Sequence, residues 1–176
     1  MLIDIAGLDS SGVSLPAGEV IDESADQFGV RYHSPAWGMQ VIANVRQASL
    51  RRLSSRPPGE GGRSVVICPG GGFHLLDEQE GAAVADMFDE RGISPFVLHY
   101  RLVPTGDDAA ADCVAALADD VRWEASVHPV VPLAVEDGRA AVSFVCGHAR
   151  EFGVAADGIG LVGFSAGAST THTWTA

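Results

Sequence analysis

A Gly-x-Ser-x-Gly pentapeptide around Ser165 directly follows a short apolar run, and it constrains the fold more than any other stretch of the 176 residues. Residues 159–162 predict a buried strand of a parallel sheet, and Ala166 begins a predicted helix. Glycines two residues before and after Ser165 permit a sharp turn between the two. Such a turn exposes the serine hydroxyl beside a helix N-terminus, where the Ala166 amide can face a developing oxyanion.

The pentapeptide alone is a weak signal, because glycine and serine are both frequent in this chain, with 21 glycines. Independent placement would produce one match in roughly one chain in five of this composition. A second glycine-rich turn strengthens it: Pro69-Gly70-Gly71-Gly72-Phe73-His74 follows the β-branched run at 64–68. Glycine lets a substrate carbonyl approach the backbone, so this turn is expected to supply oxyanion amides opposite Ala166. A purely structural turn and a phosphate-binding loop stay open as alternatives, although the phosphate fingerprints are absent.

Strand and helix patterns alternate through the rest of the chain. Residues 40–53 predict antiparallel strand material, and parallel strands are predicted at 64–68, 96–100 and 158–162. Helices are predicted from Asp77 to Arg91, over 109–117 and over 132–152. Asp77 is the expected N-cap, with Glu80 as the third-position carboxylate of a capping box. This order predicts an α/β fold with a mostly parallel sheet covered by helices on both faces.

Length and composition favour one domain, with an N-terminal arm at 1–39 and the sheet and helices at 40–176. The formal net charge of -12 argues against binding to nucleic acid or an anionic membrane, and favours a small or neutral partner molecule. The first residues show neither a signal peptide nor a membrane span, so a cytoplasmic protein is expected. Cys68, Cys113 and Cys146 lack metal-ligand spacing and are expected to be free thiols, with Cys68 and Cys146 in the core.

Several blocks together resemble the α/β-hydrolase esterases and lipases, in particular the bacterial acetyl-xylan-esterase-like or hormone-sensitive-lipase-like branch. They are Val65-Val66-Ile67-Cys68-Pro69-Gly70-Gly71-Gly72-Phe73, Phe96-Val97-Leu98-His99-Tyr100-Arg101-Leu102, Asp137-Gly138-Arg139-Ala140 and Gly163-Phe164-Ser165-Ala166-Gly167. The resemblance implies Ser165 as nucleophile and Gly71, Gly72 and Ala166 as the oxyanion hole. It also implies ester hydrolysis through an acyl-enzyme without a cofactor or metal, on small acyl esters such as acetylated sugars. Phe73 and His74 are the expected substrate contacts.

The chain departs from this family pattern after the nucleophile. The acid and the histidine of the triad follow the serine in such folds, but only His172 and no acid follows Ser165 here. On a continuous helix His172 would lie about 10 Å from Ser165 along the axis, too far to act as its base. The expectation is a hydrolase domain truncated after the nucleophile turn, with an exposed sheet edge that favours self-association. A catalytically inactive module that binds a ligand or partner is the alternative, and peptidase activity also stays open.

The carboxylate of Asp137 has a separate, structural prediction. It is expected to pair with a nearby arginine such as Arg101 and so hold a helix against the sheet.

Overall fold

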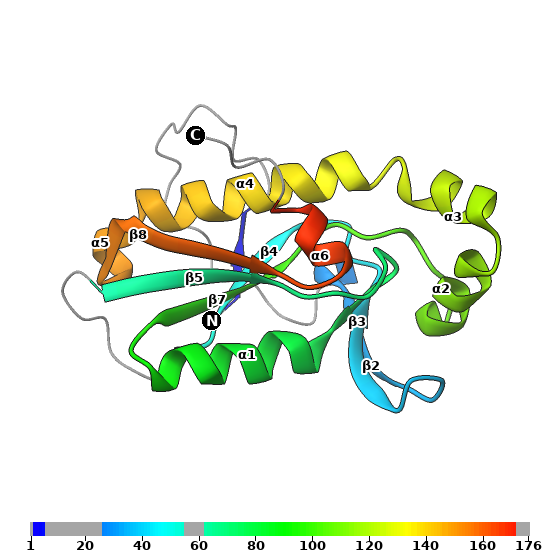
Figure 1. The fold of residues 1–176 in the computed structure, drawn as a ribbon, viewed down its shortest axis with the longest axis horizontal. Helices are drawn as coiled ribbons and strands as arrows, with labels where there is room; N and C mark the ends of the chain where they lie inside the picture. Colours follow the sequence, from blue (N-terminus) through cyan, green and yellow to red (C-terminus); the bar gives the residue numbers. More distant parts are fainter. Residues whose placement is uncertain (1, 6–25, 55–61, 172–176) are drawn as a thin grey trace.

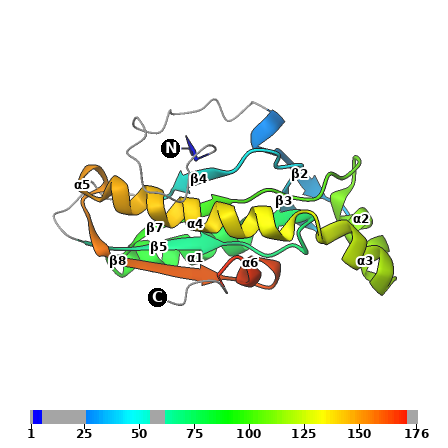
Figure 2. The same ribbon diagram turned by 90° about the horizontal axis from the view of Figure 1, so that it is seen from above.

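The computed structural model describes residues 2–5, 26–54 and 62–171, and it shows a mixed α/β fold built around a five-stranded sheet. Helix α1 covers one face of this sheet and α4 covers the other (Figures 1 and 2). The elements are β1 (Leu2–Asp4), η1 (Asp26–Phe28), β2 (Val30–Ser34), β3 (Met39–Ala43), β4 (Ser49–Arg52), β5 (Gly62–Cys68), β6 (Leu75–Asp77), α1 (Glu78–Glu90), β7 (Ser94–His99), α2 (Ala109–Leu117), α3 (Asp120–Val127), α4 (Val131–Gly147), α5 (Ala149–Phe152), β8 (Val154–Gly163) and α6 (Ala166–Ser169).

The large sheet has the strand order β1-β4-β7-β5-β8. The central strand β5 pairs in parallel with β7 and β8, whereas β4 pairs antiparallel with β7 and β1. The predicted parallel core and the predicted helices on both faces are therefore confirmed. The prediction that residues 159–162 are buried is wrong, because this part of β8 is only half-buried or exposed. Among the described strands β8 has β5 as its one neighbour, so it forms an edge of the sheet as expected.

Residues 40–53 contain two strands that belong to different sheets. Strand β4 joins the large sheet, and β3 lies between β2 and β6 in a separate antiparallel sheet of three strands. The prediction of antiparallel strands is confirmed, but their division between two sheets was not predicted. The domain boundary at residue 40 stays a prediction, and β2 pairs with β3 across it.

The two faces of β5 and β7 fill two separate parts of the core. Val66 and Phe96 point to the α4 side, where they join Phe144, and Val65 and Val97 join Ala85 of α1 on the other side. Successive side chains of a strand point to opposite faces of the sheet. A strand covered on both faces must therefore be apolar at nearly every position, which is why the run at 64–68 predicts a central strand correctly.

Helix α1 begins as predicted, but its capping box is wrong. The Asp77 carboxylate accepts hydrogen bonds from the N–H groups of Gln79 and Glu80, which confirms Asp77 as the N-cap. The Glu80 side chain does not return to the Asp77 N–H, because that group already donates to the Gly70 carbonyl at 3.0 Å. Glu80 instead accepts from the Gly70 N–H at 2.7 Å.

The single helix predicted over 132–152 is divided in two. Helix α4 ends at Gly147 and α5 begins at Ala149, with His148 between them at φ -107°. The His148 ring stacks on Phe144, and its Nδ1 lies 3.0 Å from the Phe144 carbonyl oxygen. The hydrogen bond and the stacking hold the imidazole against the last turn of α4 at the break.

The three cysteines are free, as predicted, but one location is wrong. Cys68 and Cys113 are buried, and burial raises the pKa of the Cys68 thiol to about 11. Cys146 is exposed, because α4 turns Phe144 and Val145 to the core and the next residue faces solvent. Within the described ranges no helix has the length and apolar character needed to cross a membrane.

Asp137 and Arg101 form the predicted ion pair between α4 and the segment after β7. The Asp137 carboxylate accepts from the Arg101 backbone N–H at 2.8 Å and from its guanidinium at 2.7 and 2.9 Å. The Asp137 side chain is only 6% exposed, so Arg101 supplies the compensation that a buried carboxylate needs.

Candidate active site

Ser165 lies on a strained turn between β8 and α6. Its φ of 46° and ψ of -117° lie in a region that residues with a side chain rarely adopt. Its side chain is exposed, although the next two residues, Ala166 and Gly167, are buried. The turn therefore holds the hydroxyl out from a packed support, as the pentapeptide predicts.

The two glycines of the pentapeptide are required by close backbone contacts. A Cβ atom on Gly163 would lie 2.4 Å from the Gly167 carbonyl oxygen. A Cβ atom on Gly167 would lie 2.2 Å from the Cys68 carbonyl oxygen and 2.5 Å from that of Pro69. Real Cβ atoms essentially never approach backbone atoms so closely. Glycine at both positions lets the start of α6 pack directly on the end of β5.

The glycine loop, defined here as Gly70, Gly71 and Gly72, begins beside Ser165. A Cβ atom on Gly70 would lie 3.2 Å from the Ser165 Cβ, so the two residues are immediate neighbours. Gly71 and Gly72 follow with φ values of 131° and 60°. All three glycines belong to the turn that was expected to supply oxyanion amides, although only Gly71 and Gly72 were assigned to the oxyanion hole itself.

The hydrogen bonds of the loop determine where its free N–H groups point. The Gly70 carbonyl accepts from Asp77, and the Gly71 carbonyl accepts from His74 and Leu75. A trans peptide unit directs its C=O and N–H to opposite sides, so the N–H groups of Gly71 and Gly72 point away from these donors. Within the described parts of the chain, the N–H groups of Gly71, Gly72 and Ala166 donate no hydrogen bond.

Phe73 and His74 are both largely buried. Phe73 is 5% exposed and packs edge-on against Tyr100 in the core. His74 is 3% exposed, stacks on Trp123, and has Nδ1 2.7 Å from the Gly72 carbonyl oxygen. The imidazole therefore supports the glycine loop from one side. Their expected contacts with substrate stay predictions.

A base and an acid for Ser165 are not assembled by the described residues. No described histidine hydrogen-bonds the serine, and His172 lies outside the described residues. Helix α6 ends at Ser169, so the continuous helix that was expected to carry His172 is wrong. Where the structure is described, no group of three or more His, Cys, Asp or Glu side chains is arranged to hold a metal ion.

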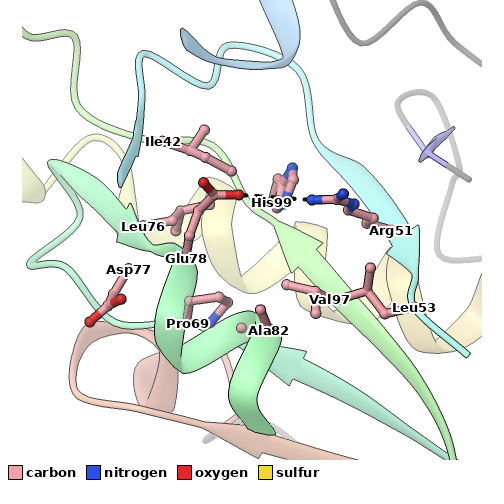
Figure 3. Close-up of a pocket in the computed structure, with 11 residues that line it drawn as sticks. Ile42, Arg51, Leu53, Pro69, Leu76, Asp77, Glu78, Ala82, Val97 and His99 are labelled. Carbon is pink, nitrogen blue, oxygen red and sulfur yellow. Dashed lines mark ion pairs between the residues drawn. The ribbon is translucent and has the colours of Figure 1, made fainter. Parts of the chain in front are cut away.

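A small pocket lies at the start of α1, and neither Ser165 nor the free amides of the glycine loop line it (Figure 3). Its polar lining includes Arg51, Glu78 and His99, and Arg31 also reaches Glu78, at 2.7 Å. Burial, with the positive charges of Arg51 and Arg31, lowers the pKa of His99 to about 3. The last residue of β7 is therefore a buried, neutral histidine whose side chain has no hydrogen bond to another described residue, and the sequence carried no signal for this.

We expect His99 to make the fold sensitive to acid. Its pKa is about 6.5 when unfolded and about 3 when folded, so only the unfolded chain takes up its proton between these values. Stability contributed by neutral His99 is therefore present above pH 6.5 and is lost as the pH falls toward 3, by up to about 1.4 kcal/mol per pH unit. Urea unfolding at pH 7, 6 and 5 measures this slope. His99→Leu should flatten it, and equal slopes in both proteins would contradict the assignment.

We also expect the Ser165 turn to store measurable strain. Backbone strain of this kind costs on the order of 1–3 kcal/mol, and glycine relieves it. Ser165→Gly should therefore raise the free energy of unfolding by about 1 kcal/mol after the larger unfolded-state entropy of glycine is subtracted. Ser165→Ala keeps the Cβ and serves as the control, with no expected gain. Equal urea midpoints for the two variants would show that the turn is unstrained.

Sequence comparison finds similar proteins over part of the chain. A family model described as BD-FAE matches residues 116–173. An acetylxylan esterase from Xylanibacter ruminicola is 42% identical over 52 residues, which are 29% of this chain and 11% of that protein.

Solved structures with the same fold match over a larger part of the chain. An acetyl ester-xyloside bifunctional hydrolase from Caldicellulosiruptor lactoaceticus superposes with a TM-score of 0.54 at 18% identity, covering 94% of this chain and 42% of that one. The apo form of Thermogutta terrifontis esterase 2 gives 0.51 at 22% identity, covering 78% and 46%. A carboxylesterase from Lactobacillus plantarum gives 0.50 at 25% identity, covering 71% and 39%.

These matches agree with the observed α/β fold. The chain spans less than half the length of each of these three structures and about a tenth of the curated relative. The chain therefore resembles esterases of the α/β-hydrolase type, in sequence over part of its length and in fold over most of it.

Proposed function

We propose that this chain carries the nucleophile and the oxyanion hole of a serine hydrolase of the carboxylesterase type. The observation that supports this most strongly is the exposed Ser165 on a strained turn, with Gly70 in direct contact with it. Strain of this kind is concentrated at functional sites, because ordinary packing gives no reason to retain it. A binding surface alone does not require it.

In the proposed reaction the Ser165 hydroxyl oxygen attacks the carbonyl carbon of an ester while a base removes its proton. The negative charge that develops on the carbonyl oxygen is stabilised by the N–H groups of Gly71, Gly72 and Ala166, which donate to no described residue. The C–O bond to the alcohol then breaks, and the alcohol leaves with the proton. Water hydrolyses the acyl-Ser165 ester by the same steps and releases the acid.

The base and acid of this reaction are proposed to come from outside the 176 residues. The hydrolases that the chain resembles are more than twice as long as this chain's matched region. Strand β8 has a free outer edge among the described strands, next to Ser165, so a further segment or a second chain can pair there. Either route brings new side chains to the carboxyl end of β8.

Small acyl esters, such as acetylated sugars, are the proposed substrates. The basis is the activity named for two of the similar proteins, an acetylxylan esterase and an acetyl ester-xyloside bifunctional hydrolase. The prediction is faster hydrolysis of p-nitrophenyl acetate than of the octanoate, and release of acetate from acetylated xylo-oligosaccharides.

The proposal is tested by p-nitrophenyl acetate hydrolysis and by labelling with a fluorophosphonate probe. The 176-residue chain is compared with Ser165→Ala, with circular dichroism used to show that both are folded. Turnover and labelling that disappear in Ser165→Ala support the serine hydrolase. Folded protein with neither signal would contradict activity of this chain by itself.

The alternative is a module that binds a ligand or partner through the same surface without catalysis. It is favoured by one observation, the absence of a base on Ser165 among the described residues. Binding of acetylated xylo-oligosaccharide, measured by calorimetry and unchanged in Ser165→Ala, would support this alternative when no turnover is found.

A further inference from the structure

We propose that Glu80 is a positioning residue, whose carboxylate fixes the glycine loop against the Ser165 turn. This inference rests on the proposed function, because it assigns Glu80 a role in building the oxyanion hole. Glu80 lies in the first turn of α1, and it is not among the site residues expected from the sequence.

The Glu80 carboxylate is in direct contact with the residue next to the nucleophile. Its Oε2 accepts the Gly70 N–H at 2.7 Å, a short bond to a charged acceptor. A Cβ atom built on Gly70 would lie 2.8 Å from this Oε2, 3.1 Å from the Phe164 carbonyl oxygen and 3.2 Å from the Ser165 Cβ. Glu80, Gly70 and Ser165 therefore meet at one point, and a larger residue at position 70 would have to displace the Glu80 carboxylate.

The peptide unit between Pro69 and Gly70 is held at both ends by side chains. Glu80 accepts from its N–H, and the buried Tyr100 hydroxyl donates to its carbonyl oxygen at 2.7 Å. The following peptide unit is held through its carbonyl, which accepts from the Asp77 N–H at 3.0 Å. The peptide units on both sides of Gly70 are thus fixed, by the start of α1 and by Tyr100, the residue after β7. Glycine has the largest backbone freedom of any residue, so a run of three needs such restraints to hold one conformation.

These restraints set the direction of the proposed oxyanion donors. The Gly71 N–H shares a peptide unit with the carbonyl held by Asp77, so rotation of that unit turns the donor away from its target. Glu80 prevents this rotation by holding the unit immediately before it. Donors must lie within a few tenths of an ångström of their productive positions, so loss of the Glu80 bond should slow acylation of Ser165.

The length of the Glu80 side chain matters more than its charge. Glutamine presents an amide oxygen at the same reach and can accept the Gly70 N–H, whereas aspartate keeps the charge but is one methylene shorter. Glu78 provides a matched control, because it is also an acid in the first turn of α1 but pairs with Arg31 and Arg51 on the side away from the loop. Replacing Glu78 by glutamine removes the same charge from the start of α1 as replacing Glu80 does.

The first measurement uses amide resonances and needs no catalysis. In ¹⁵N–¹H spectra of the 176-residue chain, Glu80→Ala and Glu80→Asp should shift the Gly70, Gly71 and Gly72 amides and speed exchange of the Gly70 amide by about 10-fold or more. Glu80→Gln and Glu78→Gln should leave Gly70 exchange near the wild-type rate. Unchanged Gly70 exchange in both folded Glu80→Ala and folded Glu80→Asp would overturn the proposal. If Glu80→Ala does not fold, the Gly70 exchange rates of Glu80→Asp and Glu80→Gln are compared instead, and equal rates in these two variants would overturn the proposal.

The second measurement is the rate of Ser165 labelling by a fluorophosphonate. We expect Glu80→Ala and Glu80→Asp to lower the second-order labelling rate by about 10- to 100-fold, and Glu80→Gln to recover most of it. A folded wild-type chain that does not label contradicts activity of this chain by itself, while the amide spectra still decide whether Glu80 fixes the loop. Wild-type labelling rates in folded Glu80→Ala would overturn the positioning role and leave the proposed activity standing.

Discussion

Replacing Gly167 by alanine is expected to unfold the chain or to lower its free energy of unfolding by more than about 4 kcal/mol. The added methyl would lie 2.2 Å from the Cys68 carbonyl oxygen and 2.5 Å from that of Pro69. Both oxygens belong to the backbone at the end of the central strand, and each already accepts a hydrogen bond, from Phe164 and Tyr100 respectively. Neither side can withdraw without breaking the contact between β5 and the Ser165 turn.

Urea unfolding followed by circular dichroism measures this loss. Gly147→Ala is the matched control, because a methyl there has no neighbour within 4 Å and the residue ends α4. This control should be neutral or stabilising by up to about 1 kcal/mol, since alanine favours helix more than glycine does. A Gly167→Ala protein with the wild-type urea midpoint would show that α6 does not pack on β5 as described.

The second large effect is expected from Asp137→Asn, with a loss of about 3 kcal/mol. The substitution keeps the shape of the side chain but removes the charge that compensates Arg101. Breaking a buried ion pair from one side leaves the other charge without a partner in a poorly solvated position. Arg101 is 29% exposed, so water solvates the unpaired guanidinium in part. The loss of free energy of unfolding is therefore expected at the lower end of the range for buried ion pairs, about 3–5 kcal/mol.

Glu136→Gln separates this pair from general charge effects. Glu136 lies 3.4 Å from the same guanidinium, but its side chain is 65% exposed. Exposed ion pairs contribute little, so its loss should change the free energy of unfolding by less than about 0.5 kcal/mol. Similar losses from Asp137→Asn and Glu136→Gln, read from thermal and urea unfolding, would argue against a dominant buried pair.

Local features of the site were predicted where they depend on neighbouring residues in the chain. The strand-turn-helix around Ser165, the N-cap at Asp77 and the end of α1 near Gly92 each depend on a few consecutive φ/ψ values and side chains. The parallel core was also predictable, because strands covered on both faces must be apolar throughout. The exception is the Asp137–Arg101 pair, a long-range contact that was predicted as the pairing of a helix carboxylate with a nearby arginine.

Contacts between distant segments explain most of what was missed. The Glu80 carboxylate could accept from the N–H of Asp77 or from the N–H of Gly70. Because α1 packs against the glycine loop, the Asp77 N–H donates to the Gly70 carbonyl, and Glu80 accepts from the Gly70 N–H. The burial of His99 depends on β4 and α1 closing over it. The solvent position of Cys146 depends on which face of α4 meets the sheet.

The sequence by itself therefore determined the alternation of the central strands and helices, the turn at Ser165 and the fold class, because these follow from periodicity and from glycine spacing within short stretches. Only the tertiary structure decided which strands share a sheet, which carboxylate holds the glycine loop and which polar groups are buried. The physical reason is that several acceptors can bond to a given hydrogen-bond donor, and the packing of distant segments against one another selects one of these acceptors.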